Sequence, residues 1–129
     1  MSDEEFDLAA PELTPDDFLI LPEDRFTTGN VALVTGAASG IGQATAVVLA
    51  ANGLAVVGTD MDEEGLAETA AIAEDCDVPG RFTHVVGNLT DDDDIERIVA
   101  AAADEGELRY LANIAGLQHI APIPEFPPE

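Results

Sequence analysis

Short apolar runs alternate with longer amphipathic or alanine-rich stretches between residues 31 and 113. Four of the runs, rich in β-branched residues, have the length of buried strands: 31–35, 54–59, 81–87 and 108–113. Three intervening segments have the composition or the apolar spacing of helices: 40–52, 62–75 and 91–105. Strands that alternate with helices form a parallel sheet with right-handed crossovers. The pattern therefore predicts an α/β fold.

The first 29 residues lack this alternation. They are acidic, contain Pro11, Pro15 and Pro22, and follow no sustained hydrophobic period. The apolar run 18–21 favours some docking onto the rest of the chain. We therefore expect two regions, an acidic N-terminal extension at 1–29 and an α/β domain at 30–129.

The first apolar run leads directly into a glycine-rich turn with the sequence TGAASGIG. Gly36 permits the turn, Gly40 lets the backbone approach a pyrophosphate, and Gly42 removes a Cβ where the next helix packs on the strand. The free N–H groups at the start of that helix face the anion. We interpret the segment as a dinucleotide-binding turn. The residues expected to contact the cofactor here are Thr35, Gly36, Ser39, Gly40, Ile41 and Gly42.

An acidic residue ends the second predicted strand. Asp60 follows Gly42 by 18 residues, close to the interval of about 20 that is typical of a ribose-binding carboxylate. Such a carboxylate accepts hydrogen bonds from both ribose hydroxyls and repels a 2′-phosphate. No basic residue stands beside it, because the nearest arginine is Arg81. The sequence therefore favours NAD over NADP, with Asp60 and Met61 in contact with the cofactor.

The charge of the chain is strongly negative. It has 27 acidic residues against four basic ones, all arginine, for a formal net charge of −23. Self-repulsion on this scale is relieved by salt, which favours a cytoplasmic protein of a salt-accumulating halophile over an acidic mesophilic protein or a partly disordered tail. Nothing in the chain can neutralise a nucleic-acid backbone or an anionic membrane. No apolar run reaches the length of a membrane span, and the acidic N-terminus is unlike a signal peptide.

Two other features are interpreted as structural. The aspartate run 91–94 precedes an amphipathic helix, so helix capping explains it better than a metal site does. Cys76 is the only cysteine, which excludes an internal disulfide and a multi-cysteine metal site. We therefore expect no metal in this chain.

The glycine spacing TGxxxGIG, the acid after the second strand and the sequence ANIAG at 112–116 together resemble the short-chain dehydrogenase/reductase family. The resemblance covers residues 26–129 and implies a Rossmann-type doubly wound sheet that is incomplete, with four strands in the order 3-2-1-4. The domain at 30–129 would then be a partial NAD-binding domain. The resemblance also implies cofactor contacts by Asn88, Leu89, Asn113, Ala115 and Gly116.

Three positions depart from the usual pattern of that family. Asn30 stands where a lysine is frequent, and Asn88 stands where an aspartate usually contacts adenine. The side-chain carbonyl of Asn88 still suits an adenine amino group. Ile114 replaces the second asparagine of the common NNAG motif and removes its hydrogen bonds.

The segment after Gly116 resembles 3-hydroxybutyrate dehydrogenases in particular. The resemblance implies that Gln118 helps to hold a substrate carboxylate, whereas His119 matches a motif position without a firm role. For both residues, a local hydrogen bond to the backbone is the structural alternative.

The catalytic residues of the resembled enzymes have no counterpart here. Those enzymes use a tyrosine as acid and base and a lysine that lowers its pKa. This chain has no lysine, and its only tyrosine, Tyr110, lies in the fourth predicted strand, where packing is the better interpretation. We therefore expect the cofactor half of such an enzyme, inactive alone, with an exposed fourth strand that a complementing catalytic chain or a homo-oligomer covers. The alternative is a non-catalytic nucleotide-binding module or a gene remnant.

Overall fold

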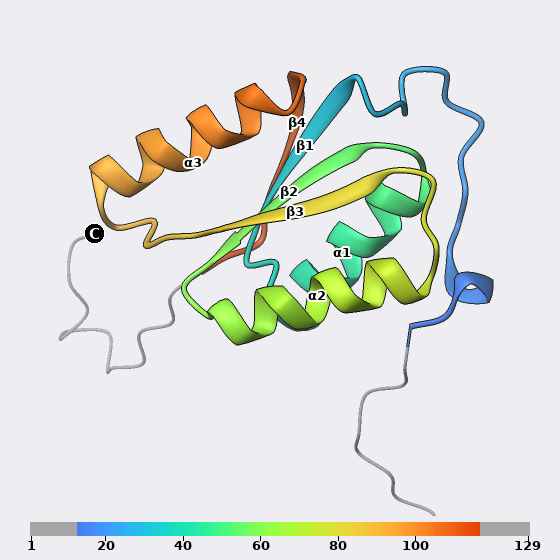
Figure 1. The fold of residues 1–129 in the computed structure, drawn as a ribbon, viewed down its shortest axis with the longest axis horizontal. Helices are drawn as coiled ribbons and strands as arrows, with labels where there is room; N and C mark the ends of the chain where they lie inside the picture. The colour runs from blue at the N-terminus through green and yellow to red at the C-terminus, as the bar shows by residue number, and fades with distance from the viewer. Residues whose placement is uncertain (1–12, 117–129) are drawn as a thin grey trace, which may run out of the picture.

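Four parallel strands and three helices alternate in the computed structural model, which describes residues 13–116 (Figure 1). The sheet has the order β3-β2-β1-β4, and all three pairings are parallel. This confirms the predicted Rossmann-type fold and its strand order. A short 3-10 helix, η2 (Pro15–Asp17), precedes the sheet and was not expected. The elements of the α/β region are β1 (Asn30–Thr35), α1 (Gly40–Ala51), β2 (Ala55–Asp60), α2 (Glu63–Asp75), β3 (Arg81–Val86), α3 (Asp92–Asp104) and β4 (Glu107–Asn113).

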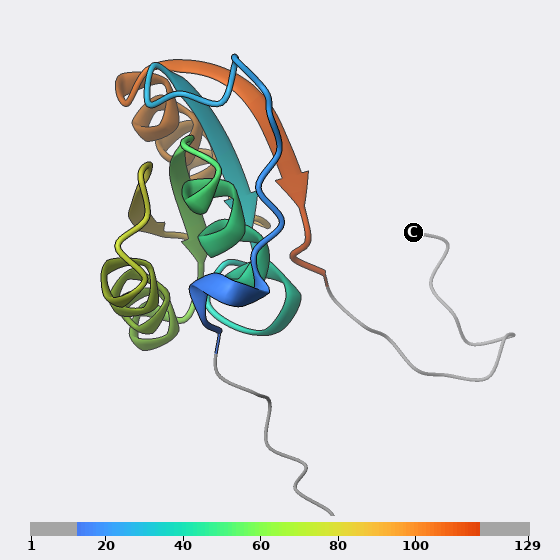
Figure 2. The same cartoon turned by 90° about the vertical axis from the view of Figure 1, so that its right-hand side faces the viewer.

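The two faces of the sheet are covered by different helices (Figures 1 and 2). On one face, Ala32 and Val34 of β1 pack with buried residues of α1 and α2. On the other face, Val31 and Leu33 pack with Ile98 and its neighbours in α3. The two central strands are therefore apolar on both faces, as in parallel sheets that are sandwiched between helices.

Aspartate caps fix where two of the helices begin. The Asp62 side chain accepts a hydrogen bond from the N–H of Gly65, and Asp91 accepts from the N–H groups of Asp93 and Asp94. Each aspartate is therefore the residue before its helix, so α2 and α3 start one residue later than the apolar pattern predicted. The capping role expected for the 91–94 run is confirmed.

The strand β4 is largely exposed on one face. Its register with β1 places Leu108 opposite Val31 and Leu111 opposite Leu33, which is the face that α3 covers on β1. Leu111 is nevertheless 61% exposed. On the other face, Tyr110 packs edge-to-face against Phe26, with 5.8 Å between ring centroids. The α3-side face of β4 is therefore an uncovered apolar surface within the part of the chain that the structure describes.

The Asn52 side chain fastens residues 19–21 of the N-terminal segment to the end of α1. The Asn52 Oδ1 atom accepts a hydrogen bond of 2.7 Å from the N–H of Leu21, and its Nδ2 atom donates to the carbonyl oxygen of Leu19 at 3.0 Å. Asn52 is also the C-cap residue of α1. The segment is thus fastened through its backbone, while the side chains of Leu19, Ile20 and Leu21 are exposed.

Replacing Gly42 by alanine is expected to destabilise the fold by about 1–3 kcal/mol, as overpacking of a tight contact does. A Cβ on Gly42 would overlap the carbonyl oxygen of Gly36. Urea unfolding of Gly42→Ala, compared with the parent chain, measures the loss. Gly29→Ala is the matched control, because its Cβ would meet only the Thr27 hydroxyl at 3.7 Å. Equal stability of Gly42→Ala and the parent would show that this contact is loose.

Candidate functional site

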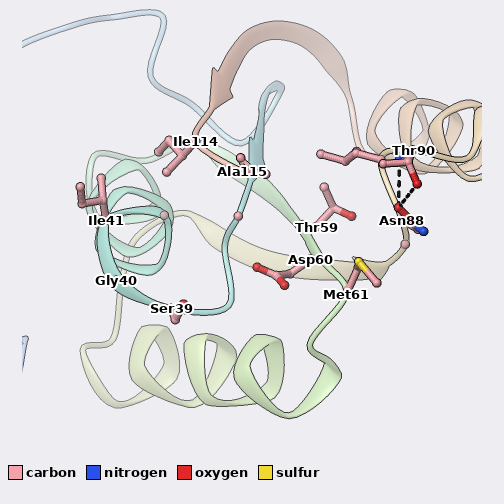
Figure 3. A pocket seen from close by; sticks show the side chains of 15 residues that line it. Ser39, Gly40, Ile41, Thr59, Asp60, Met61, Asn88, Thr90, Ile114 and Ala115 are labelled. Carbon is pink, nitrogen blue, oxygen red and sulfur yellow. Dashed lines mark hydrogen bonds between the residues drawn. The ribbon is translucent and has the colours of Figure 1, made fainter. Parts of the chain in front are cut away.

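A cleft of about 640 Å³ opens where the four strands end (Figure 3). In a parallel α/β sheet, ligands bind outside the carboxyl ends of the strands, because the loops there carry the free helix N-termini. Each strand contributes a loop or its last residues to this cleft. The lining residues are Gly36, Ser39, Gly40, Ile41, Gly42, Thr59, Asp60, Met61, Gly87, Asn88, Leu89, Thr90, Ile114, Ala115 and Gly116.

The start of α1 supplies unused hydrogen-bond donors to the cleft. Its N-cap residue, Ser39, makes no side-chain capping bond, and the first turn contains no acidic residue. Gly40 has a positive φ of 55°, and no atom lies within 4 Å of the position a Cβ would take. The start of α1 is therefore uncapped, with open space beside Gly40 at the positive end of the helix dipole, an arrangement that suits an anion.

Close backbone contacts hold the glycine turn in place. A Cβ on Gly36, where φ is 74°, would lie 2.8 Å from the backbone nitrogen of Ala115. The turn therefore lies directly against the segment that follows β4. Gly42 in turn packs on the carbonyl of Gly36, so its closest contact is with the turn itself, whereas the sequence had suggested the strand. Larger side chains at either position would push these segments apart.

Asp60 joins the glycine turn to the start of α2. Its Oδ2 atom accepts a hydrogen bond of 3.2 Å from the N–H of Ala38, and its Oδ1 atom accepts one of 3.0 Å from the N–H of Asp62. Figure 3 shows the carboxylate in the cleft between the two segments. A carboxylate has about four lone-pair sites, so each oxygen can still accept a hydrogen bond from a ribose hydroxyl.

The hydroxyl of Thr35 joins the ends of β1 and β4. It donates to Asn113 Oδ1 at 3.2 Å and accepts from the N–H groups of Ile114 at 3.0 Å and Ala115 at 3.1 Å. Thr35 is buried and does not line the cleft. Asn113 is exposed and does not line the cleft either. Thr35 therefore lies behind the surface of the cleft and, with Asn113, positions the residues that form it.

Hydrogen bonds among its own residues and to α3 hold the loop after β3 in place. Asn88 Oδ1 accepts hydrogen bonds from both the N–H and the hydroxyl of Thr90, at 2.9 and 2.7 Å (Figure 3). The N–H of Asn88 donates to Asp94, which also pairs with Arg97. These contacts lower the pKa of Asp94, the hydrogen bond from Asn88 being the larger cause. The carbonyl oxygen that we expected to face an adenine is thus used within the loop, which leaves the Nδ2 group of Asn88 for a ligand.

Four cleft residues were not expected from the sequence: Thr59, Gly87, Thr90 and Ile114. Each is a sequence neighbour of a residue that was expected, so the predicted ends of the strands could have identified these four residues as well. Thr59 is fully buried, and its hydroxyl has no hydrogen-bond partner among the described residues. Gln118 and His119 lie outside the described residues.

Residues interpreted as structural do not line the cleft. Cys76 follows α2 at the end of the helix away from Asp60, and burial raises the pKa of its thiol. Tyr110 packs against the core on the α1 side of the sheet. Within residues 13–116, no three acidic, histidine or cysteine side chains are arranged to hold a metal ion. Among the helices of this range, none combines the length and apolarity needed to cross a bilayer.

Comparison with known families identifies the class of this protein. Residues 30–129 match the short chain dehydrogenase family. The chain therefore belongs to the short-chain dehydrogenase family, whose members bind nicotinamide cofactors.

Individual relatives agree with this assignment. The 3-oxoacyl-(acyl-carrier-protein) reductase FabG of Thermotoga maritima is 39% identical over 90 residues, which cover 69% of this chain and 36% of the relative. An NAD+-bound xylitol dehydrogenase is 34% identical, with a TM-score of 0.67 over 81% of this chain and 40% of that one. An actinorhodin polyketide ketoreductase variant with NADPH is 33% identical, with a TM-score of 0.69 over 78% and 38%. The chain thus spans little more than a third of the curated relative.

Replacing Thr35 by valine is expected to cost about 1–3 kcal/mol, because two backbone N–H groups lose their acceptor in a partly buried site. Urea unfolding measures the loss, and amide hydrogen exchange at Ile114 and Ala115 locates it. Thr35→Ser keeps the hydroxyl and serves as the control. Unchanged exchange at these two amides in Thr35→Val would contradict the role assigned to the hydroxyl.

Proposed function

We propose that this chain forms the NAD-binding half of a short-chain oxidoreductase that interconverts a 3-hydroxy and a 3-oxo acyl compound. The observation that carries the proposal is the cleft, in which the uncapped start of α1 faces Asp60 across the glycine turn. A dinucleotide carries an anionic pyrophosphate next to a ribose with two hydroxyl groups. The pyrophosphate fits the uncapped start of α1, and the ribose hydroxyls fit Asp60.

The residues present fit the cofactor. The N–H groups around Gly40 would hold the pyrophosphate, and Asp60 would accept hydrogen bonds from the adenosine ribose. Leu89 and Met61 would contact the base, with the Asn88 Nδ2 group as a donor to a ring nitrogen. When bound, the nicotinamide accepts or donates the hydride.

We propose a preference for NAD over NADP because of the negative charge in the part of the cleft that would hold the adenosine ribose. Asp60 lines the cleft, and no arginine or histidine of the described part of the chain does so. A 2′-phosphate would add about −1.5 to −2 charges there. The relatives bound to NAD+ and to NADPH support a nicotinamide cofactor of either kind, so the preference rests on the residues of this chain.

Two lines support the substrate class. The relative from Thermotoga maritima is named for a 3-oxoacyl substrate. The resemblance around Gln118 favours 3-hydroxybutyrate, whose oxidation gives a 3-oxo acid. Both compounds present an oxygen at carbon 3 of an acyl chain, so we propose that chemical class, with 3-hydroxybutyrate as its particular member.

A complementing polypeptide or a second copy is proposed to cover β4. The exposed side chains of Leu108 and Leu111 give this strand an apolar face next to an edge that no other strand of residues 13–116 covers. Such a surface favours association. The tyrosine and lysine that the family uses for catalysis would come with the complementing polypeptide.

Cofactor binding is tested by calorimetry with NAD in about 1 M KCl, where charge repulsion is screened to about 3 Å. Saturable binding is expected for the parent chain. Gly40→Val fills the open space at the turn and should weaken binding on the order of tenfold or more, equivalent to at least about 1.4 kcal/mol. Gly40→Ala controls for the cost of a side chain at positive φ. Undiminished affinity in a folded Gly40→Val variant would contradict the placement of the pyrophosphate.

Catalysis is tested by adding a polypeptide that carries the family's tyrosine and lysine. NADH formation from NAD and 3-hydroxybutyrate is expected in the mixture and not with either chain alone. Leu111→Asp should suppress it by placing a charge on the uncovered face of β4, whereas Leu19→Asp, on an even more exposed side chain outside the sheet, should not. Equal activity of the two variants would contradict the proposed contact surface.

A further inference from the structure

Among residues 13–116, no cationic side chain lines the cleft to offset a bound anion. Every arginine of the chain is within an ion pair: Arg25 with Glu23, Arg81 with Glu105, Arg97 with Asp94, and Arg109 with Glu107. None of them lines the cleft. The N–H groups and dipole of α1 are therefore the positive groups that the described residues offer to a pyrophosphate.

Two acidic turns border this cleft. The helices α2 and α3 both begin in loops that line it, after Met61 and Thr90 respectively, and both start at the same end of the sheet (Figure 1). Their caps and first turns are acidic and largely exposed. We call the following residues the acidic rim: Asp62, Glu63, Glu64, Asp91, Asp92 and Asp93.

We propose that the acidic rim is a second determinant of cofactor choice, which rejects the extra phosphate of NADP through long-range repulsion and therefore acts in a salt-dependent way. This inference rests on the proposed NAD-binding function. It predicts that cofactor affinity rises with salt. A site that binds phosphate through lysine or arginine behaves in the opposite way, because salt weakens such ion pairs.

The rim and Asp60 differ in how salt affects them. Asp60 lies in the cleft, where it would contact the ribose directly, so salt screens its effect little. The rim residues act across solvent, where the Debye length falls from about 10 Å at 0.1 M salt to about 3 Å at 1 M. NADP carries about two more negative charges than NAD, so repulsion from the rim weakens NADP binding more than NAD binding.

An independent observation points to a polar ligand group in the cleft between the two acidic turns. Thr59 lines the cleft and is fully buried, yet its hydroxyl has no partner among the described residues. In Figure 3 this side chain lies between Asp60 and the Asn88–Thr90 loop. A buried hydroxyl without a partner is costly, which is consistent with a polar group that belongs there.

The experiment measures the dissociation constants of NAD and NADP by calorimetry at about 0.1 M and about 1 M KCl, with circular dichroism confirming a folded sample. The ratio of the two constants cancels any salt effect on folding. We expect NAD to bind several-fold more tightly at high salt. The ratio of the NADP to the NAD dissociation constant should decrease on the order of tenfold over the same range of salt. The reason is that the two extra charges of NADP are repelled by the six carboxylates of the acidic rim, and salt screens this repulsion.

The rim variant carries Glu63→Gln, Glu64→Gln, Asp92→Asn and Asp93→Asn, and spares both caps. At low salt, this variant should already show the weaker preference for NAD that the parent chain shows at high salt. The control variant carries Glu74→Gln, Asp75→Asn, Asp77→Asn and Asp104→Asn, an equal change in charge at exposed positions near the opposite ends of α2 and α3. It should retain the dependence on salt. Asp60→Asn should lower the preference at both salt concentrations.

The possible outcomes separate this inference from the proposed function. Absence of saturable NAD binding at both salt concentrations would overturn the proposed function. NAD binding with a preference that does not change with salt would overturn the role of the rim alone. An equal response of the rim and control variants would also overturn it, since net charge would then explain the effect.

Discussion

The close approach of three backbone segments is the constraint on which the rest of this structure depends. Gly36 lies against the chain at Ala115, and Gly42 lies against the carbonyl of Gly36. The start of α1 and the end of β4 are thereby brought to the same turn. The hydroxyl of Thr35 joins the end of β1 to the residues after β4, by accepting hydrogen bonds from the N–H groups of Ile114 and Ala115. The cleft opens beside these contacts, where the start of α1 has no side-chain cap.

The three helices use their positive ends differently. In α2 and α3, aspartate caps and acidic first turns satisfy the free N–H groups and the dipole. In α1, neither a cap bond nor an acidic residue is present. A chain with 27 acidic residues has thus kept one helix start free of them. Local stability and anion binding are alternative uses of the same physical property, and this fold assigns them to different helices.

Much of the fold followed from the sequence, because buried strands and glycine turns have strong local patterns. The turn at Thr35–Gly42 and the position of Asp60 were predicted from these patterns, and the structure brings Asp60 beside the turn. The strand order was predicted from the resemblance to the family, and the structure confirms it. The internal use of Asn88 Oδ1 was not predicted, since it depends on how Thr90 folds back. The role of Asn52 was missed for a related reason, because its partners are more than 30 positions away. Contacts of this kind leave no periodic signal.

The Asn52 amide has a consequence for local unfolding. One side chain binds the backbone of the N-terminal segment and also the Val48 carbonyl in the last turn of α1. If this turn frays, the segment loses its anchor, whereas the Val48 carbonyl keeps the backbone N–H of Asn52 as a donor when the segment detaches. Fraying of the turn therefore also releases the segment. The glycine turn lies at the other end of the same helix, so motions of the N-terminal segment are coupled first to the part of α1 farthest from the cleft.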